Sequence, residues 1–248
     1  MTTATGLGAY SSDVLEEVER VRRVVADLHA ELPRWDLVVW TAGNVSQRLR
    51  SADLFVVKPS GVSYADLTPE SMVVCDLDGV LVDGERAPSS DTAAHAYVYR
   101  HMPEVGGVVH THSTYATAWA ARAEPIPCVL TMMADEFGGD VPVGPFALIG
   151  DDSIGRGIVE TLRESRSPAV LMRNHGPFTI GKDGRSAVKA AVMVEEVART
   201  VHISRQLGEP LSIAKDDIDR LYDRYQNVYG QTAAAPIHRT TESTEESR

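Results

Sequence analysis

Hydrophobic residues recur every three or four positions over residues 14–32, a spacing that places them on one face of a helix. Ser12 and Asp13 directly precede this pattern and are suitable residues for capping its amino end. The same kind of spacing predicts three further helices, over residues 153–165, 184–207 and 216–226. Another helix is expected to begin at Ser89, Ser90 or Asp91 and to end before Pro103, which cannot continue it.

Five short runs of β-branched and other apolar residues, bounded by turn residues, are typical of buried strands. They are LVVW at 37–40, LFVV at 54–57, MVVCD at 72–76, GGVVHTH at 106–112 and AVLM at 169–172. The strands come in runs rather than in strict alternation with helices, which favours an antiparallel sheet. We therefore expect an α/β fold with a mostly antiparallel sheet and helices on both of its sides.

Both ends of the chain lack this patterning. Residues 1–12 are mostly small and polar, and residues 232–248 contain neither aromatic residues nor an apolar period. Such segments cannot bury enough surface to offset the entropy of ordering them, so both are predicted to be disordered. No internal repeat or long linker interrupts residues 13–231, which are expected to form a single domain.

Composition excludes several classes of protein. The 24 basic and 35 acidic residues give a formal net charge of −11, which argues against a nucleic-acid partner. Two cysteines, Cys75 and Cys128, cannot form a disulfide framework or a four-cysteine zinc module, and they fit a reducing cytoplasm. No apolar run is long enough to span a membrane, and the first residues do not resemble a secretory signal. We predict a cytoplasmic protein.

The strongest chemical signal is His110-Thr111-His112 at the end of a predicted strand. Alternate residues of a strand face the same side, so both imidazoles can bind one metal ion. Zinc needs three or four ligands, and the candidates for the others are Asp91, His95, His101 and His175.

Each of these residues also has an ordinary structural interpretation. The two strand histidines can be a hydrogen-bonded pair, His175 can be a turn residue, and Asp91 can be a helix cap. Asp91 with His95, one helical turn later, is a rival ligand pair. The remaining histidines are expected on the surface or on helix faces: His29, His101, His202 and His238.

Three short segments are suited to holding an anion. TAGNVS at 41–46 and KPSG at 58–61 combine glycines with hydroxyl, amide or ammonium groups, and Ser89-Ser90 precedes a predicted helix amino end. Each segment alone is also typical of an ordinary turn or cap. Their occurrence together with a metal site points to a phosphorylated substrate.

In order and separation, GNVS, KPSG, PSSDT, GGVVHTHS and NHGPF resemble the class II aldolase/adducin family. The resemblance covers residues 14–231, and the ending Val228-Tyr229-Gly230-Gln231 is similar to the L-ribulose-5-phosphate 4-epimerase branch of that family. It implies a three-layer α/β/α domain with a central, predominantly antiparallel sheet. It also implies a homotetramer with four-fold symmetry and active sites at the subunit interfaces.

The resemblance also implies a site. Zn²⁺, or else Mn²⁺ or Co²⁺, would be bound by His110, His112 and His175 with Asp91 at or near the metal, while His95 would belong to the core. The phosphate would be bound by Asn44, Ser60, Gly61, Ser89 and Ser90, with Lys58 close to the substrate. Asp135 and Tyr229, the second from a neighbouring subunit, would be the acid/base pair.

The implied activity is the interconversion of L-ribulose 5-phosphate and D-xylulose 5-phosphate in arabinose and other pentose catabolism. Because C4 carries no acidic proton, the route is retro-aldol cleavage of C3–C4 and re-formation of the bond on the opposite face. An aldolase such as fuculose-phosphate aldolase, or an epimerase of another ketose phosphate, is the alternative. A non-enzymatic, adducin-like module is disfavoured because the histidines are intact.

Some residues depart from the pattern of the epimerases and put the exact sugar in question. Ala42 replaces a tryptophan, Ile218 stands where a histidine is usual, and residues 130–133 are less polar. Asp91 and Lys58 favour the epimerase, because aldolases of the family carry Glu at the position of Asp91 and have no lysine at the position of Lys58.

Overall fold

The computed structural model describes residues 6–228, and Tyr229 lies outside them. A 3-10 turn at Leu7–Ala9 leads into helix α1, Ser12–Arg34, which buries the predicted apolar face. Leu7 and Tyr10 pack against the same apolar cluster as this face. Part of the segment that was predicted to be disordered thus has apolar contacts that its composition did not indicate.

The centre of the molecule is an eight-stranded sheet in the order β4-β3-β2-β1-β5-β8-β7-β6. Its strands are β1 Asn44–Arg48, β2 Leu54–Val57, β3 Val73–Asp76, β4 Leu81–Asp83, β5 Gly107–His110, β6 Val143–Gly144, β7 Ala169–Met172 and β8 Gly176–Gly181. All neighbours are antiparallel except β6 and β7. The prediction of a predominantly antiparallel sheet is confirmed.

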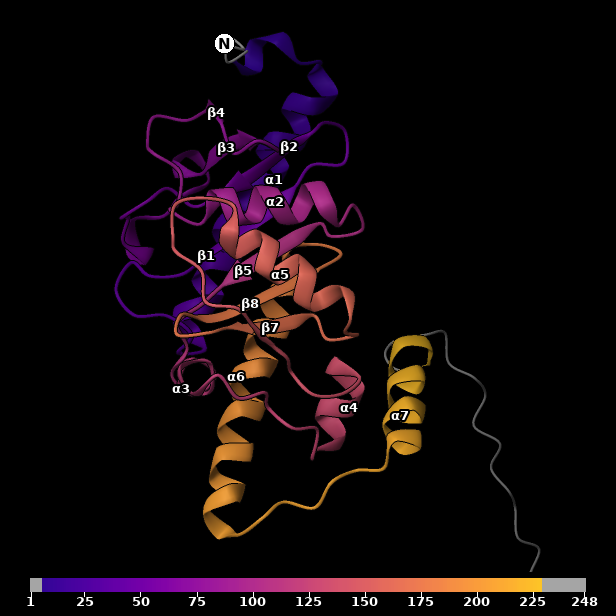
Figure 1. Cartoon of the computed structure of the whole chain (residues 1–248). Coiled ribbons are helices and arrows are strands. Elements are labelled where there is room, and N and C mark those ends of the chain that lie inside the picture. Colours follow the sequence, from indigo (N-terminus) through magenta and orange to yellow (C-terminus); the bar gives the residue numbers. More distant parts are fainter. Residues whose placement is uncertain (1–5, 229–248) are drawn as a thin grey trace, which may run out of the picture.

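Helices cover both faces of this sheet, as Figure 1 shows. One face packs against α2, Thr92–His101, and α5, Ser153–Arg163; the other packs against α1 and α6, Gly184–Leu207. Adjacent residues of β5 point to opposite faces of the sheet. Val108 packs in the apolar cluster with α2 and α5, and Val109 packs in the cluster with α1 and α6. The fold is therefore the expected three-layer α/β/α arrangement.

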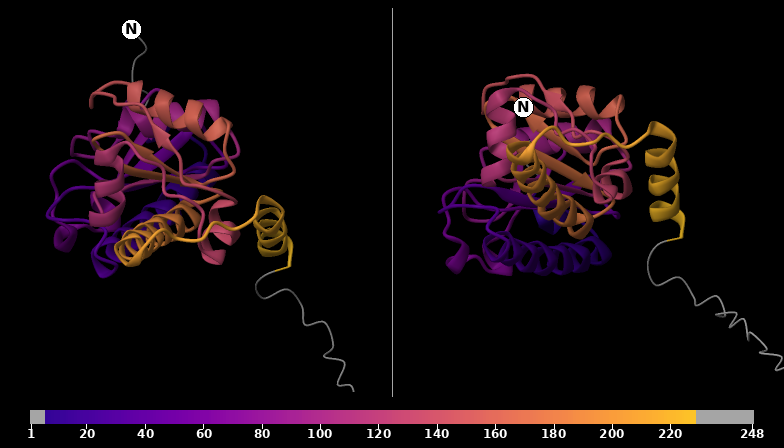
Figure 2. Two further views of the ribbon diagram at one scale, coloured as in Figure 1. Left: turned by 60° about the horizontal axis from the view of Figure 1, so that its bottom comes forward. Right: turned by 90° about the horizontal axis from the view of Figure 1, so that it is seen from below.

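Three further helices lie at the β6–β7 end of the molecule. α3, Thr114–Arg122, and α4, Thr131–Phe137, share an apolar cluster with α6. α7, Lys215–Asn227, follows an extended segment and lies to one side, beside α4 (Figure 2). An ion pair of 2.6 Å between Arg166 and Asp219 helps to hold α7 in place. Within residues 6–228, no helix has the length and apolar character needed to cross a membrane.

One predicted strand is absent. Residues 37–40 form no strand: Leu37 is buried, but Trp40 is 88% exposed and has a left-handed backbone with φ of 59°. His29, which was expected on the surface or on a helix face, lies on the buried face of α1 against β1, where its ring nitrogens contact the Val25 carbonyl and the Val45 N–H. Strands β1, β4, β6 and β8 and helices α3 and α4 were not predicted.

Candidate metal and phosphate site

Three histidines meet where β5 and β8 lie side by side. His110 ends β5, His112 follows it, and His175 stands between β7 and β8. The antiparallel register pairs His110 with Phe178, which brings the turn containing His175 to the end of β5. Ligand nitrogens of the three imidazoles all lie within 4.8 Å of one another. The predicted histidine cluster is thus formed by the fold.

The cluster fits a bound cation. His110 Nδ1 donates to the Pro177 carbonyl at 3.0 Å, so its Nε2 carries the lone pair that can bind an ion; this Nε2 contacts His112 Nε2 at 2.8 Å. His175 Nδ1 is buried without a hydrogen-bond partner. Burial lowers the pKa of His110 to about 3 and also lowers the pKa values of His112 and His175. Neutral imidazoles are the form that binds metals.

Asp91 lies behind the histidines at the amino end of α2. Its Oδ2 accepts a hydrogen bond of 2.7 Å from Asn44, and its buried Oδ1 has no hydrogen-bond partner. Burial would raise the pKa of Asp91, but the nearby His110 and His95 rings, with the Asn44 hydrogen bond, hold it below its ordinary value. Asp91 makes no side-chain capping bond, which leaves the carboxylate for the site.

The rival pair of Asp91 and His95 is disfavoured by the surroundings of His95. This ring is fully buried, and its Nδ1 contacts the Ser46 hydroxyl at 2.7 Å. Ser46 also contacts the Tyr99 hydroxyl at 2.7 Å, so one side of the ring belongs to a polar network inside the core, while His95 Nε2 has no hydrogen-bond partner among the described residues. His95 is therefore a core residue beside the site.

The structure brings the predicted phosphate segments together. Residues 58–61 and 87–90 run antiparallel, with bonds from Ser60 N to the Ala87 carbonyl and from Ser89 N to the Lys58 carbonyl. Asn44 Nδ2 reaches the Ser89 hydroxyl at 3.0 Å. Ser60, Gly61 and Ser90 are exposed, so the Ser60 and Ser90 hydroxyls and the Gly61 backbone are accessible to a ligand.

Lys58 is buried rather than directed into solvent. Its Nζ donates to the Thr41 carbonyl at 3.0 Å and lies 5.4 Å from the centre of the Tyr64 ring. Burial lowers the pKa of Lys58. In this chain the ammonium group links the loop before Asn44 to the loop that carries Ser60.

The proposed acid/base pair is only partly described. Asp135 lies on α4, where its Oδ1 is 3.5 Å from Arg224 of α7. Tyr229 lies outside the described residues.

Sequence patterns did not reveal three neighbours of the site. Phe178 stacks on His110 with ring centres 4.1 Å apart, and the Pro177 carbonyl fixes the orientation of the His110 ring. Tyr64 donates to the Ala42 carbonyl at 2.8 Å and so supports the turn before Asn44. Pro177 and Phe178 both stand within the NHGPF motif, whereas Tyr64 lies outside every motif singled out in the sequence.

Three converging histidines with a buried carboxylate behind them are the arrangement of a metal-dependent enzyme. Residues 23–202 match the family model described as the class II aldolase and adducin N-terminal domain, and the chain belongs to this family. The L-ribulose-5-phosphate 4-epimerase UlaF of Salmonella paratyphi B is 42% identical over 212 residues, covering 80% of this chain and 91% of that protein. The UlaF protein of Salmonella typhi matches to the same extent.

Solved structures show the same fold. An L-fuculose 1-phosphate aldolase superposes with a TM-score of 0.78 at 28% identity, covering 88% of this chain and 98% of the aldolase. YgbL of Klebsiella pneumoniae, a putative aldolase/epimerase/decarboxylase, gives a TM-score of 0.72 at 28% identity over 82% of this chain and 98% of its own. The fold and the metal dependence of the family thus agree with the histidine cluster.

Proposed function

We propose that this protein is a zinc-dependent epimerase that interconverts L-ribulose 5-phosphate and D-xylulose 5-phosphate. The observation that carries the proposal is the cluster of His110, His112 and His175, whose ring nitrogens converge beside the paired loops that carry Ser60 and Ser89. The 42% identity to the UlaF epimerases supports the choice of reaction. The enzyme would act in the cytoplasm, in the catabolism of arabinose or related pentoses.

In this proposal, His110, His112 and His175 hold the ion, with Asp91 close to it, and Mn²⁺ or Co²⁺ could replace Zn²⁺. The ion supplies Lewis-acid stabilisation of the negative charge that develops when C3–C4 breaks. Asn44 orients Asp91 through the 2.7 Å hydrogen bond, and Pro177 and Phe178 fix the plane of the His110 ring.

The phosphate is assigned to Asn44, Ser60, Gly61, Ser89 and Ser90. Holding it keeps the two-carbon aldehyde fragment in the site while its carbonyl group rotates. Lys58, beneath these residues, adds positive charge close to the bound anion.

Two groups are needed for the proton on the C4 oxygen, one for each face of the aldehyde. We assign Asp135 to one face and Tyr229 to the other. We place the complete site between chains, in a homotetramer, as the resemblance to the epimerases of this family implies. Tyr229 would then come from the neighbouring subunit.

The second candidate function is that of a sugar-phosphate aldolase, which releases the aldehyde. The TM-score of 0.78 to an L-fuculose 1-phosphate aldolase favours this alternative, because both reactions need the same metal centre. Retention of the aldehyde fragment distinguishes the two functions.

A coupled assay of zinc-loaded protein with L-ribulose 5-phosphate tests the proposal. The assay follows D-xylulose 5-phosphate and free aldehyde separately. Formation of the epimer without free aldehyde supports the epimerase. Free aldehyde and dihydroxyacetone in equal amounts identify an aldolase, and the absence of both products refutes the assignment of this substrate.

A further inference from the structure

A wide cavity of the described chain lies away from the histidines. It has a volume of about 1180 Å³ and is formed by α1, the turn between β1 and β2, the segment before β5 and the turn between β8 and α6. Strand β1 runs from Asn44 at the metal site to Arg48 at this cavity, and β5 runs from the cavity to His110. The cavity and the metal site therefore occupy opposite ends of the same two strands.

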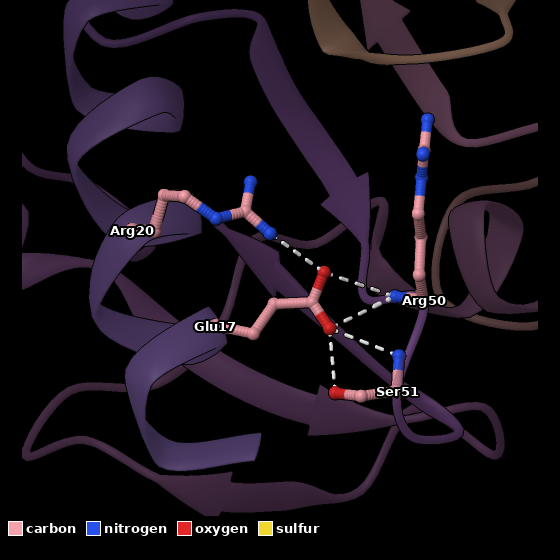
Figure 3. Close-up of polar contacts among 4 residues, drawn as sticks. All are labelled: Glu17, Arg20, Arg50 and Ser51. Carbon is pink, nitrogen blue, oxygen red and sulfur yellow. Dashed lines mark hydrogen bonds and ion pairs between the residues drawn. The ribbon is translucent and has the colours of Figure 1, made fainter. Parts of the chain in front are cut away.

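Most acidic side chains of the cavity already form hydrogen bonds or ion pairs within the chain. Glu17 accepts hydrogen bonds from the backbone N–H groups of Arg50 and Ser51 and from the Ser51 hydroxyl, and it pairs with Arg20 at 2.8 Å (Figure 3). Burial would raise the pKa of Glu17, but these donors hold it below its ordinary value.

Two more carboxylates are engaged in the same way. Asp53 pairs with Arg48 at 2.8 Å, and Asp183 caps α6 by accepting from Ser186 N at 2.7 Å. Of the four acidic residues that line the cavity, only Glu104 has a side chain without a hydrogen bond or ion pair to the described residues. The acidic groups thus leave little negative charge to oppose an anion.

Three positively charged side chains of the cavity form no such hydrogen bonds or ion pairs with the described residues. Within residues 6–228, the side chains of Arg50, Lys182 and Arg185 make no hydrogen bond or ion pair. All three are exposed, and the Arg50 guanidinium extends away from Glu17 although its backbone N–H is bound there (Figure 3). This gathering of free positive charge is found in a chain whose net charge is −11.

We propose that this cavity binds a small, multiply charged phosphate ester, such as a sugar bisphosphate, separately from the substrate. Arginine guanidinium groups match phosphate oxygens with paired hydrogen bonds, and a lysine adds a point charge. The volume is sufficient for a compound of this size. Among residues 6–228, no aromatic side chain lines the cavity, so the described lining does not favour a nucleobase over a sugar.

The test is calorimetric titration of the full-length, zinc-loaded protein with D-fructose 1,6-bisphosphate at low salt. The double variant R50Q/R185Q removes two of the free cations. The matched control R23Q/R163Q removes two exposed arginines that do not line the cavity. Binding should weaken about a hundredfold in R50Q/R185Q and change less than about twofold in the control.

Equal affinity in R50Q/R185Q and the wild type would overturn the proposal, because the bisphosphate would then occupy the active site alone. Equal weakening in both double variants would also overturn it, since that result indicates a general effect of net charge. Near-UV circular dichroism checks the fold of each variant independently of any activity. If R50Q/R185Q does not fold, K182Q replaces it, with an expected weakening of about tenfold.

Discussion

His29 should make the stability of this protein depend strongly on pH. Its Nδ1 donates to the Val25 carbonyl at 2.7 Å, and its Nε2 accepts from the Val45 N–H at 2.9 Å. The ring is fully buried, and burial lowers its pKa from 6.5 to about 3 because the interior disfavours the charged imidazolium. His29 therefore stays neutral in the folded chain over the pH range in which the unfolded chain protonates it.

The magnitude follows from these two pKa values. A group whose pKa is lower in the folded chain than in the unfolded chain contributes stability at pH values above the unfolded pKa. This contribution is lost as the pH falls toward the folded pKa. From pH 7.5 to pH 5, linkage predicts a loss of about 2 kcal/mol in the free energy of unfolding from His29 alone. Such a loss is a large fraction of the stability of an ordinary domain.

The assay is urea unfolding of His29→Gln at pH 7.5 and pH 5. Glutamine can still accept a hydrogen bond from the Val45 N–H but does not titrate. Both proteins are measured with chelator, so that the metal-site histidines contribute equally, and His202→Gln on the exposed face of α6 serves as control.

Between the two pH values, His29→Gln should lose about 2 kcal/mol less stability than the wild type, and His202→Gln should follow the wild type. An identical loss in His29→Gln and the wild type would refute the reasoning.

Three further predictions concern the site. His112→Ala should lose its stoichiometric metal by elemental analysis and lower kcat about a thousandfold or more; a metal-free, active variant would contradict the ligand assignment. Asp135→Asn and Tyr229→Phe should each keep the metal and lower kcat about a hundredfold or more. Oligomers mixed from the two variants should regain activity, because some sites then combine an intact Asp135 with an intact Tyr229. No recovery of activity would contradict a site shared between chains. Gly43→Ala should lower the free energy of unfolding by about 2–4 kcal/mol, since φ is 80° and the new Cβ would lie 2.9 Å from the His110 carbonyl; an unchanged melting temperature would contradict this.

Helices with a long apolar period could be predicted well from the sequence. The pattern over residues 184–207 coincides with α6, since a capping Asp183 precedes the helix and Gly208 follows it. β8 was missed because its residues, GPFTIG, combine turn-forming glycine and proline with few apolar residues. That strand is stabilised by pairing with β5 and β7, an interaction between segments distant in sequence.

The interpretation of 37–40 as a strand failed for the opposite reason. Its β-branched residues favour a strand locally, but no neighbouring strand pairs with them, and Trp40 turns the chain. The burial of His29 could have been predicted, because His29 lies one turn after Val25 on the buried face of α1.

Residue types and spacing indicated His110 and His112 as proposed metal ligands, and the family resemblance selected His175 among the other candidates, whereas the supports of these residues could not be predicted. His110 and His112 stand two apart at a strand end, and His175 follows an apolar run. The Pro177 carbonyl carries no sequence signal as a hydrogen-bond acceptor, and the link from Asn44 to Asp91 joins positions 47 residues apart. Such contacts appear only when the antiparallel pairing of the strands is known.

The most direct test of the proposed epimerase uses L-ribulose 5-phosphate that carries carbon-13 at both C3 and C4, mixed with unlabelled substrate. Carbon NMR of the products from zinc-loaded protein shows whether the two labels stay bonded. The account predicts D-xylulose 5-phosphate in which C3 and C4 remain coupled, because the fragments recombine before they leave the site. Labels separated into free dihydroxyacetone and glycolaldehyde phosphate would contradict it.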